Sequence, residues 1–214
     1  MELKDINELT KAAYDKTAIK YHINFKDEIS QKEYDRLLLD KFSDLLEPSS
    51  LICDAGCGPS SQAGRYLYGK GHRVTGIDIS PKCVEIAKEY NPGMEFRTAD
   101  IMNTGFEDDT FDGIVSYHSI IYTPKVHIGS IFSEFHRILK LGGKMLVVVK
   151  KGTTEGIIDD EWYEGNIVYF TYFLESEIKK YFNDGGFTVL YSDTRKPYDF
   201  EIDVERMYTT GIKN

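Results

Sequence analysis

The sequence predicts an α/β protein whose doubly wound, mostly parallel seven-stranded sheet carries helices on both faces and an antiparallel last strand. Strand-like and helical segments alternate from residue 51 onward, which is typical of parallel βαβ units. Several strands are apolar on both faces, as strands covered from two sides are. No helical pattern separates the last two strand-like segments, so we expect them to pair antiparallel.

Length and composition fit one folded domain. The chain has 214 residues, of which 41% are hydrophobic and 29% are charged, and this is enough to bury a core. The formal net charge of -9 repels polyphosphates and anionic lipids. We therefore expect neither nucleic acid nor a membrane as a partner.

Cysteine, histidine and apolar patterns narrow the class further. Cys53, Cys57 and Cys83 lack the C-x-x-C spacing of zinc and redox sites, so reduced thiols are expected. The histidines show no H-x-x-x-H pattern, and no metal is expected. The longest nearly apolar run, residues 145 to 149, is far shorter than the ~20 residues that span a bilayer. The N-terminal residues also lack a signal-peptide core, so we expect a cytoplasmic protein.

Residues 1 to 48 are predicted to be helical. Residues 30 to 33, Ser-Gln-Lys-Glu, have the pattern of a capping box. Residues 1 to 29 combine many charges with few apolar anchors, so we expect a lid that opens at low free-energy cost when the site is empty. Apolar residues at helical spacing follow the capping box, namely Tyr34, Leu37, Leu38, Phe42, Leu45 and Leu46.

Residues 49 to 150 predict the parallel part of the sheet. Helices are expected at residues 61 to 70, from Ser80 as N-cap with Pro81 in the first turn, and from Thr123-Pro124 to Gly142-Gly143. The strands expected between these helices are residues 51 to 55, 73 to 78, 94 to 100, 111 to 117 and 144 to 150.

Residues 151 to 214 predict an insertion and a hairpin. A polar and aromatic stretch precedes a helix at 175 to 184, which Gly185-Gly186 ends. Strands are expected at 187 to 192 and 204 to 212. The aromatic side chains of the insertion either form the wall of a ligand pocket or pack as a satellite cluster, namely Trp162, Tyr163, Tyr169 and Tyr172.

A glycine-containing turn and three acidic residues meet at one sheet edge. Residues 54 to 61, DAGCGPSS, lie where the first strand turns into a helix, and glycine there lets a ligand approach the backbone. Asp78 and Asp100 end the next two strands, and a carboxylate in such a position accepts hydrogen bonds from a ribose diol. Ser61 occupies the third glycine position of the dinucleotide fingerprint, which makes a pyrophosphate site less favourable.

This pattern resembles the class I S-adenosylmethionine-dependent methyltransferases. Asp54, Gly56 and Gly58 are similar to the family's first motif, with Ser60 in place of its last glycine. The resemblance implies that the two glycines pass under the methionine part of the cofactor and that Asp54 orients its amino group.

The resemblance also implies the remaining cofactor contacts. Asp78, with Ile79, would hold the ribose hydroxyls, Asp100 and Ile101 would meet the adenine edge, and Ser116 would contact the cofactor. Tyr14 and Tyr21 are similar to the tyrosine-rich segment that small-molecule members fold over the cofactor. The similarity covers residues 50 to 150 and includes LKLGG, which resembles the family's LKPGG turn.

The catalytic candidates follow the fourth strand. Tyr117 and His118 would face the methyl group, and His118 would accept a proton from a hydroxyl or amine, since its ordinary pKa is about 6.5. The alternative for His118 is a packing role in the loop.

The resemblance implies methyl transfer to an O or N nucleophile of a small molecule by in-line displacement, with S-adenosylmethionine and without metal. It divides a single domain into an N-terminal lid or cap (1 to 48), a cofactor-binding half (49 to 150) and a substrate-side insertion with a hairpin (151 to 214). The alternatives are a dinucleotide-dependent oxidoreductase and a non-catalytic S-adenosylmethionine-binding module. The acceptor and the oligomeric state stay open.

Overall fold

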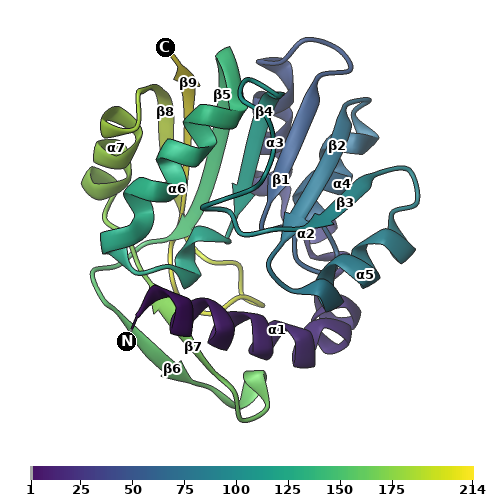
Figure 1. Cartoon of the computed structure of the whole chain (residues 1–214), viewed down its shortest axis with the longest axis vertical. Helices are drawn as coiled ribbons and strands as arrows, with labels where there is room; N and C mark the ends of the chain where they lie inside the picture. Colours follow the sequence, from purple (N-terminus) through teal and green to yellow (C-terminus); the bar gives the residue numbers. More distant parts are fainter. Residues whose placement is uncertain (1) are drawn as a thin grey trace.

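The computed structural model describes residues 2–214, and Met1 lies outside the described residues. A seven-stranded sheet in the order β3-β2-β1-β4-β5-β9-β8 forms its centre (Figure 1). β9 runs antiparallel to both of its neighbours, while the strands from β3 to β5 are parallel. This confirms the predicted fold class. The strands are β1 (Leu51–Ala55), β2 (Arg73–Asp78), β3 (Glu95–Thr98), β4 (Phe111–Tyr117), β5 (Leu139–Lys150), β8 (Phe187–Arg195) and β9 (Arg206–Lys213).

Helices cover both faces of the sheet, because its strands are apolar on both sides. α6 (Lys125–Ile138) and α7 (Glu175–Asp184) pack on the face that carries Cys53 and Ala55. α3 (Glu33–Asp44) and α4 (Gln62–Gly69) pack on the opposite face, against Ile52. α5 (Pro81–Tyr90) lies against β2 and β3.

The longest helix lies across the carboxyl edge of the sheet. α1 (Leu3–Phe25) contacts α5 and β7, and Figure 1 shows it beside the hairpin of β6 (Glu155–Asp159) and β7 (Ile167–Thr171). Short 3-10 turns, η1 (Ile120–Tyr122) and η2 (Glu161–Tyr163), complete this edge. The buried apolar side chains of α1 are few, namely Ile6, Ala13 and Ala18.

The capping-box prediction is wrong. α2 (Glu28–Gln31) ends before Lys32, and α3 begins at Glu33 without a side-chain cap. The Ser30 hydroxyl instead donates to the Asp27 carbonyl at 2.6 Å. Lys32 is only 3% exposed, because its ammonium is drawn inward between two carboxylates that the sequence pattern does not identify.

The predicted end of the helix that precedes β5 is also wrong. α6 ends at Ile138, and Leu139 already belongs to β5, so Gly142-Gly143 lies inside an irregular strand. Leu139 is fully buried and therefore continues the apolar pattern of the helix without being part of it. The β6–β7 hairpin was not predicted.

Other boundaries confirm their predictions. The Ser80 hydroxyl accepts from the Cys83 N–H at the start of α5, α6 begins directly after Pro124, and Gly185 ends α7.

Within residues 2–214, no helix is both long and apolar enough to cross a membrane. The same residues contain no group of three or more side chains arranged to hold a metal ion. The three cysteine thiols are buried and free, namely Cys53, Cys57 and Cys83.

Candidate active site

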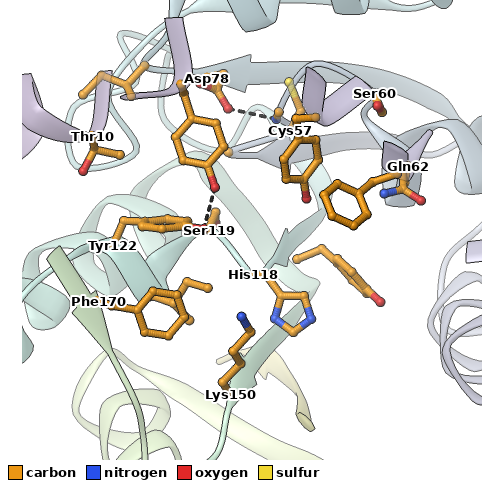
Figure 2. A pocket seen from close by; sticks show the side chains of 18 of the residues that line it. Thr10, Cys57, Ser60, Gln62, Asp78, His118, Ser119, Tyr122, Lys150 and Phe170 are labelled. Atoms are coloured by element: carbon orange, nitrogen blue, oxygen red, sulfur yellow. Dashed lines mark hydrogen bonds between the residues drawn. The ribbon is translucent and has the colours of Figure 1, made fainter. Parts of the chain in front are cut away.

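A cavity of about 590 Å³ lies at the carboxyl edge of the sheet. Its walls come from the ends of β1, β2 and β4, from α1, from the β6–β7 hairpin and from residues 200 to 206 (Figure 2). The volume is within the range of small-molecule sites. Eleven of the twelve predicted site residues line it, and the exception is Ser116.

The turn after β1 presents backbone to the cavity. Gly56 has a φ of +76°, and its N–H donates to the Ile77 carbonyl at 2.8 Å. A Cβ on Gly56 would lie 2.2 Å from the Cβ of Ser119, so only glycine fits. Gly58 has a φ of +59° and open space where a Cβ would be. A ligand can therefore approach the backbone at Gly58.

Two buried carboxylates flank this turn. Asp54 accepts from the Ser61 hydroxyl at 2.6 Å and from the Gly64 N–H at 3.2 Å. Asp78 accepts from the Gly58 N–H at 2.8 Å and from the Ser80 N–H at 2.9 Å. Burial raises the pKa of each carboxyl to about 6. Neither forms an ion pair with any residue that the structure describes, so this end of the cavity favours a cationic ligand.

The third acidic residue is held by the N-terminal helix. One Asp100 oxygen accepts from the side-chain amide of Asn7 and the other from the Met102 N–H, both at 2.8 Å. Ile79 and Ile101 line the cavity beside it. The sequence analysis did not identify Asn7, because nothing around a single asparagine in a polar helix indicates that it will contact Asp100.

Tyrosine rings close the cavity from α1 and the hairpin. The Tyr14 hydroxyl donates to that of Tyr122, which lies 3.4 Å from the Tyr163 hydroxyl. Burial raises the pKa of Tyr122 to about 12, and it also raises those of Tyr14 and Tyr21. These phenols are therefore neutral at pH 7, and their rings and hydroxyl groups line the cavity.

Ser119, not Ser116, lies on the cavity wall. Ser116 is fully buried within the end of β4, and its hydroxyl lies 2.6 Å from that of Ser119. Ser116 therefore does not line the cavity, whereas Ser119 does, since the chain turns into η1 there and brings Ser119 over Gly56.

Tyr117 and His118 lie where β4 ends. The Tyr117 hydroxyl donates to buried Asp35, so this group is engaged beneath the cavity. His118 has a φ of +58°, its backbone N–H donates to Val148, and its Nδ1 is buried without a partner. Burial, together with the positive charge of Lys150, holds the pKa of His118 well below its usual value. Its imidazole is neutral at pH 7 and faces the cavity (Figure 2).

The aromatic side chains of the insertion both form part of the cavity wall and pack in a satellite cluster. Trp162, Tyr163 and Tyr172 line the cavity, and Tyr163 also packs with Ala13 in a small apolar cluster. Tyr169 does not line the cavity, because side chains alternate along β7 and the next residue, Phe170, faces inward.

The resemblance implies that the methyl donor binds around Gly58, Asp78 and Asp100, so we call this region the donor end of the cavity. We call the region around His118 and Lys150 the acceptor end. The acceptor end also contains polar groups that sequence reasoning missed, namely Glu28, Lys32, Lys150, Glu201 and Arg206. They come from four separate segments, so no local motif marks them.

Comparison with known proteins identifies the family. A family model described as a methyltransferase domain matches residues 53–147, which include the glycine turn, Asp78 and Asp100. This segment belongs to the class I S-adenosylmethionine-dependent methyltransferase family. These enzymes take their methyl group from that donor.

Curated relatives of this methyltransferase differ in what their names say they methylate. A phosphoethanolamine N-methyltransferase 2 of Caenorhabditis elegans is 29% identical over 210 residues, which are 92% of this chain and 46% of that protein. A sterol 24-C-methyltransferase of Saccharomyces cerevisiae is 27% identical over 176 residues, 73% of this chain and 44% of that protein. The chain thus spans less than half the length of these relatives.

A solved structure shares the fold of this methyltransferase. The crystal structure of an S-adenosylmethionine-dependent methyltransferase from Methanosarcina mazei superposes with a TM-score of 0.71 at 19% sequence identity. The match covers 79% of this chain and 95% of that one.

Proposed function

We propose that the chain transfers a methyl group from S-adenosylmethionine to an O or N nucleophile of a small molecule by in-line displacement. The observation that carries the proposal is a single cavity with two chemically different ends. The donor end is acidic and lined by exposed backbone at Gly58, whereas the acceptor end is lined by His118 and Lys150. Such a pocket would hold the two reactants close together, which the displacement requires.

The donor end suits S-adenosylmethionine, whose amino group and sulfonium are cationic. Asp54, a buried carboxylate without an ion-pair partner among the described residues, would face the amino group. Asp78, with Ile79, would hold the ribose hydroxyls, which donate to carboxylates. Asp100 and Ile101 would meet the adenine edge, with Asn7 fixing the Asp100 carboxylate.

When bound, S-adenosylmethionine supplies an activated methyl group on a positively charged sulfur. The chain contributes alignment and exclusion of water, which are the main requirements of such a displacement. Tyr14 and Tyr21 on α1 would cover the donor and present ring faces that attract a cation. We propose that residues 1 to 48 act as the lid or cap, 49 to 150 as the cofactor-binding half and 151 to 214 as the substrate side.

His118 is the proposed proton acceptor. Its neutral imidazole faces the acceptor end, and an O–H or N–H nucleophile loses a proton as it gains the methyl group. Tyr117 would position the loop that carries His118, because its hydroxyl is fixed by Asp35. A His118→Gln variant should bind the donor normally and lose turnover, whereas a packing role would change stability instead.

Calorimetry with S-adenosylhomocysteine and with NAD tests the proposal. Tight binding of S-adenosylhomocysteine without NAD binding is expected, and the opposite result would favour the dinucleotide-dependent oxidoreductase. Release of S-adenosylhomocysteine from S-adenosylmethionine in the presence of acceptor mixtures would then separate an enzyme from a non-catalytic binding module. Asp109→Asn, in an exposed residue far from the cavity, provides a control for the Asp78→Asn variant.

A further inference from the structure

Three basic residues form a row across the last three strands of the sheet. Lys150 ends β5, Arg206 begins β9 and Arg195 ends β8. The strand register pairs Lys150 with Arg206, and Arg206 with Arg195. Side chains directly opposite each other in an antiparallel pair lie on the same face, and like charges in such positions destabilise the pair. The row therefore requires negative charge nearby.

Two buried carboxylates compensate one side of this row. Glu201 accepts from Arg195 at 2.5 and 2.9 Å and from the Lys32 ammonium at 2.7 Å. Asp35 accepts from Arg195 at 3.0 Å. Arg206 lies 3.5 Å from Glu201 through its Nε, which has no hydrogen-bond partner. The negative charge of Glu201 is thus shared among three cations.

Lys150 is left without a negatively charged partner. Within residues 2–214, its ammonium makes no hydrogen bond or ion pair, and it lies 4.7 Å from the centre of the Phe170 ring. Burial and the charges of Arg206 and Lys32 lower its pKa to about 8, so it still carries its charge at pH 7. Figure 2 shows the ammonium pointing into the cavity near His118.

The cavity is divided by charge. The cationic side chains that line it within the described part of the chain are Lys32, Lys150 and Arg206, and all three lie at the acceptor end. The carboxylates Asp54, Asp78 and Asp100 line the donor end. Two carboxylates, Glu28 and Glu201, also lie at the acceptor end, but both form ion pairs with Lys32. A molecule that extends from the donor toward Lys150 therefore passes from an acidic end to one where three cations outnumber two carboxylates.

We infer that the methyl acceptor carries an anionic group, a carboxylate or a phosphate, that binds to Lys150 beside Arg206. The inference rests on the proposed function, which assigns the opposite end to the methyl donor. An anion at this position would neutralise the ammonium that Glu201 does not reach, whereas a cationic acceptor would add a further positive charge to the row. Lys150 is thus a specificity-determining residue.

Titration with inorganic phosphate tests the basic end without knowledge of the acceptor. The melting temperature is measured against phosphate concentration at constant ionic strength, with and without S-adenosylhomocysteine. We expect a saturable rise in the native chain. Lys150→Met should weaken the apparent affinity roughly tenfold or more, as expected for loss of a bond to a charged group. Lys151→Met is the matched control, because Lys151 pairs with Glu205 outside the cavity.

The variants include a check of folding. Lys150→Met should bind S-adenosylhomocysteine like the native chain, since Lys150 lies at the acceptor end, and Lys150→Arg should restore phosphate binding. A linear, unsaturable phosphate response in the native chain would overturn the inference. So would an equal saturable response in Lys150→Met.

Paired acceptors then separate this inference from the proposed function. Phenols and amines are offered both as carboxylates and as the corresponding carboxamides, and release of S-adenosylhomocysteine is measured. We expect the carboxylates to be preferred, with Lys150→Met raising KM more than it lowers kcat. Equal turnover of carboxamides would overturn the inference and leave the methyltransferase intact. Failure to bind S-adenosylhomocysteine would instead refute the proposed function, and the phosphate titration without it would still report on Lys150.

Discussion

The raised pKa of Asp78 predicts that donor binding depends on pH in the acidic range. In the empty cavity, burial raises the pKa of this carboxyl to about 6. Below pH 6 this carboxyl is mostly protonated, and it must lose its proton before a ligand can donate hydrogen bonds to its ionised form. At pH 5 only about one molecule in eleven is ionised, which costs about 1.4 kcal/mol, or a factor of about ten in affinity. Affinity for S-adenosylhomocysteine should therefore fall as the pH drops through 6.

The Asp78→Asn variant isolates this effect. It keeps one acceptor oxygen for a backbone N–H but removes the charge, so affinity at pH 7.5 should fall by about 1.5–3 kcal/mol. The affinity of the variant should depend less steeply on pH. The remaining dependence would come from Asp54, because its pKa is also about 6. Calorimetry between pH 5 and 8 measures both quantities, with Asp109→Asn as control. A native affinity that is constant across this range, or a variant that keeps the native slope, would show that Asp78 does not bind the donor as a carboxylate.

Three further results are expected. Gly56→Ala should abolish donor binding and lower the melting temperature, because its Cβ would overlap Ser119. Gly105, with a similar φ of +70°, has open space where a Cβ would be. Gly105→Ala should therefore lower stability only through the strained backbone conformation and should bind the donor normally. S-adenosylhomocysteine should slow amide exchange in residues 2 to 25 more than in the sheet, and equal slowing in both would make α1 a static cap. Anion affinity should fall as the pH rises through 8, because Lys150 then loses its charge, and Lys150→Met should show no such loss in binding titrations.

The fold could be predicted because its information is local. Alternating strand and helix patterns, Ser80-Pro81 and the glycines after α7 each lie within a few residues of the element that they define. The acidic donor end could be predicted for a related reason. Parallel strands end at one edge, so Asp54, Asp78 and Asp100 meet there without any detailed knowledge of register.

The acceptor end could not be predicted, because it depends on contacts between distant segments. Lys150 looks like an ordinary polar end of an apolar strand, and only the antiparallel register places it opposite Arg206. Lys32 was assigned to a capping box, although its partner Glu201 lies in a loop close to the other end of the chain. The β6–β7 hairpin was missed because β6, EGIID, shows no apolar–polar alternation, and β7, IVYFT, was interpreted only as part of a polar and aromatic insertion.

The pairing of Lys32 with Glu201 also has an evolutionary consequence. The glycine turn and the three donor-end carboxylates lie within a continuous middle segment, whereas the acceptor end also takes Lys32, Glu201 and Arg206 from the two outer parts of the chain. Substitutions in those outer parts can therefore change which molecule is recognised without disturbing the donor turn. New substrate preferences can arise on an unchanged donor half, in agreement with the general rule that function depends on sites built onto a common fold. Comparative sequencing of related chains should find Lys32, Lys150, Glu201 and Arg206 varying together, at a different rate from the glycine turn.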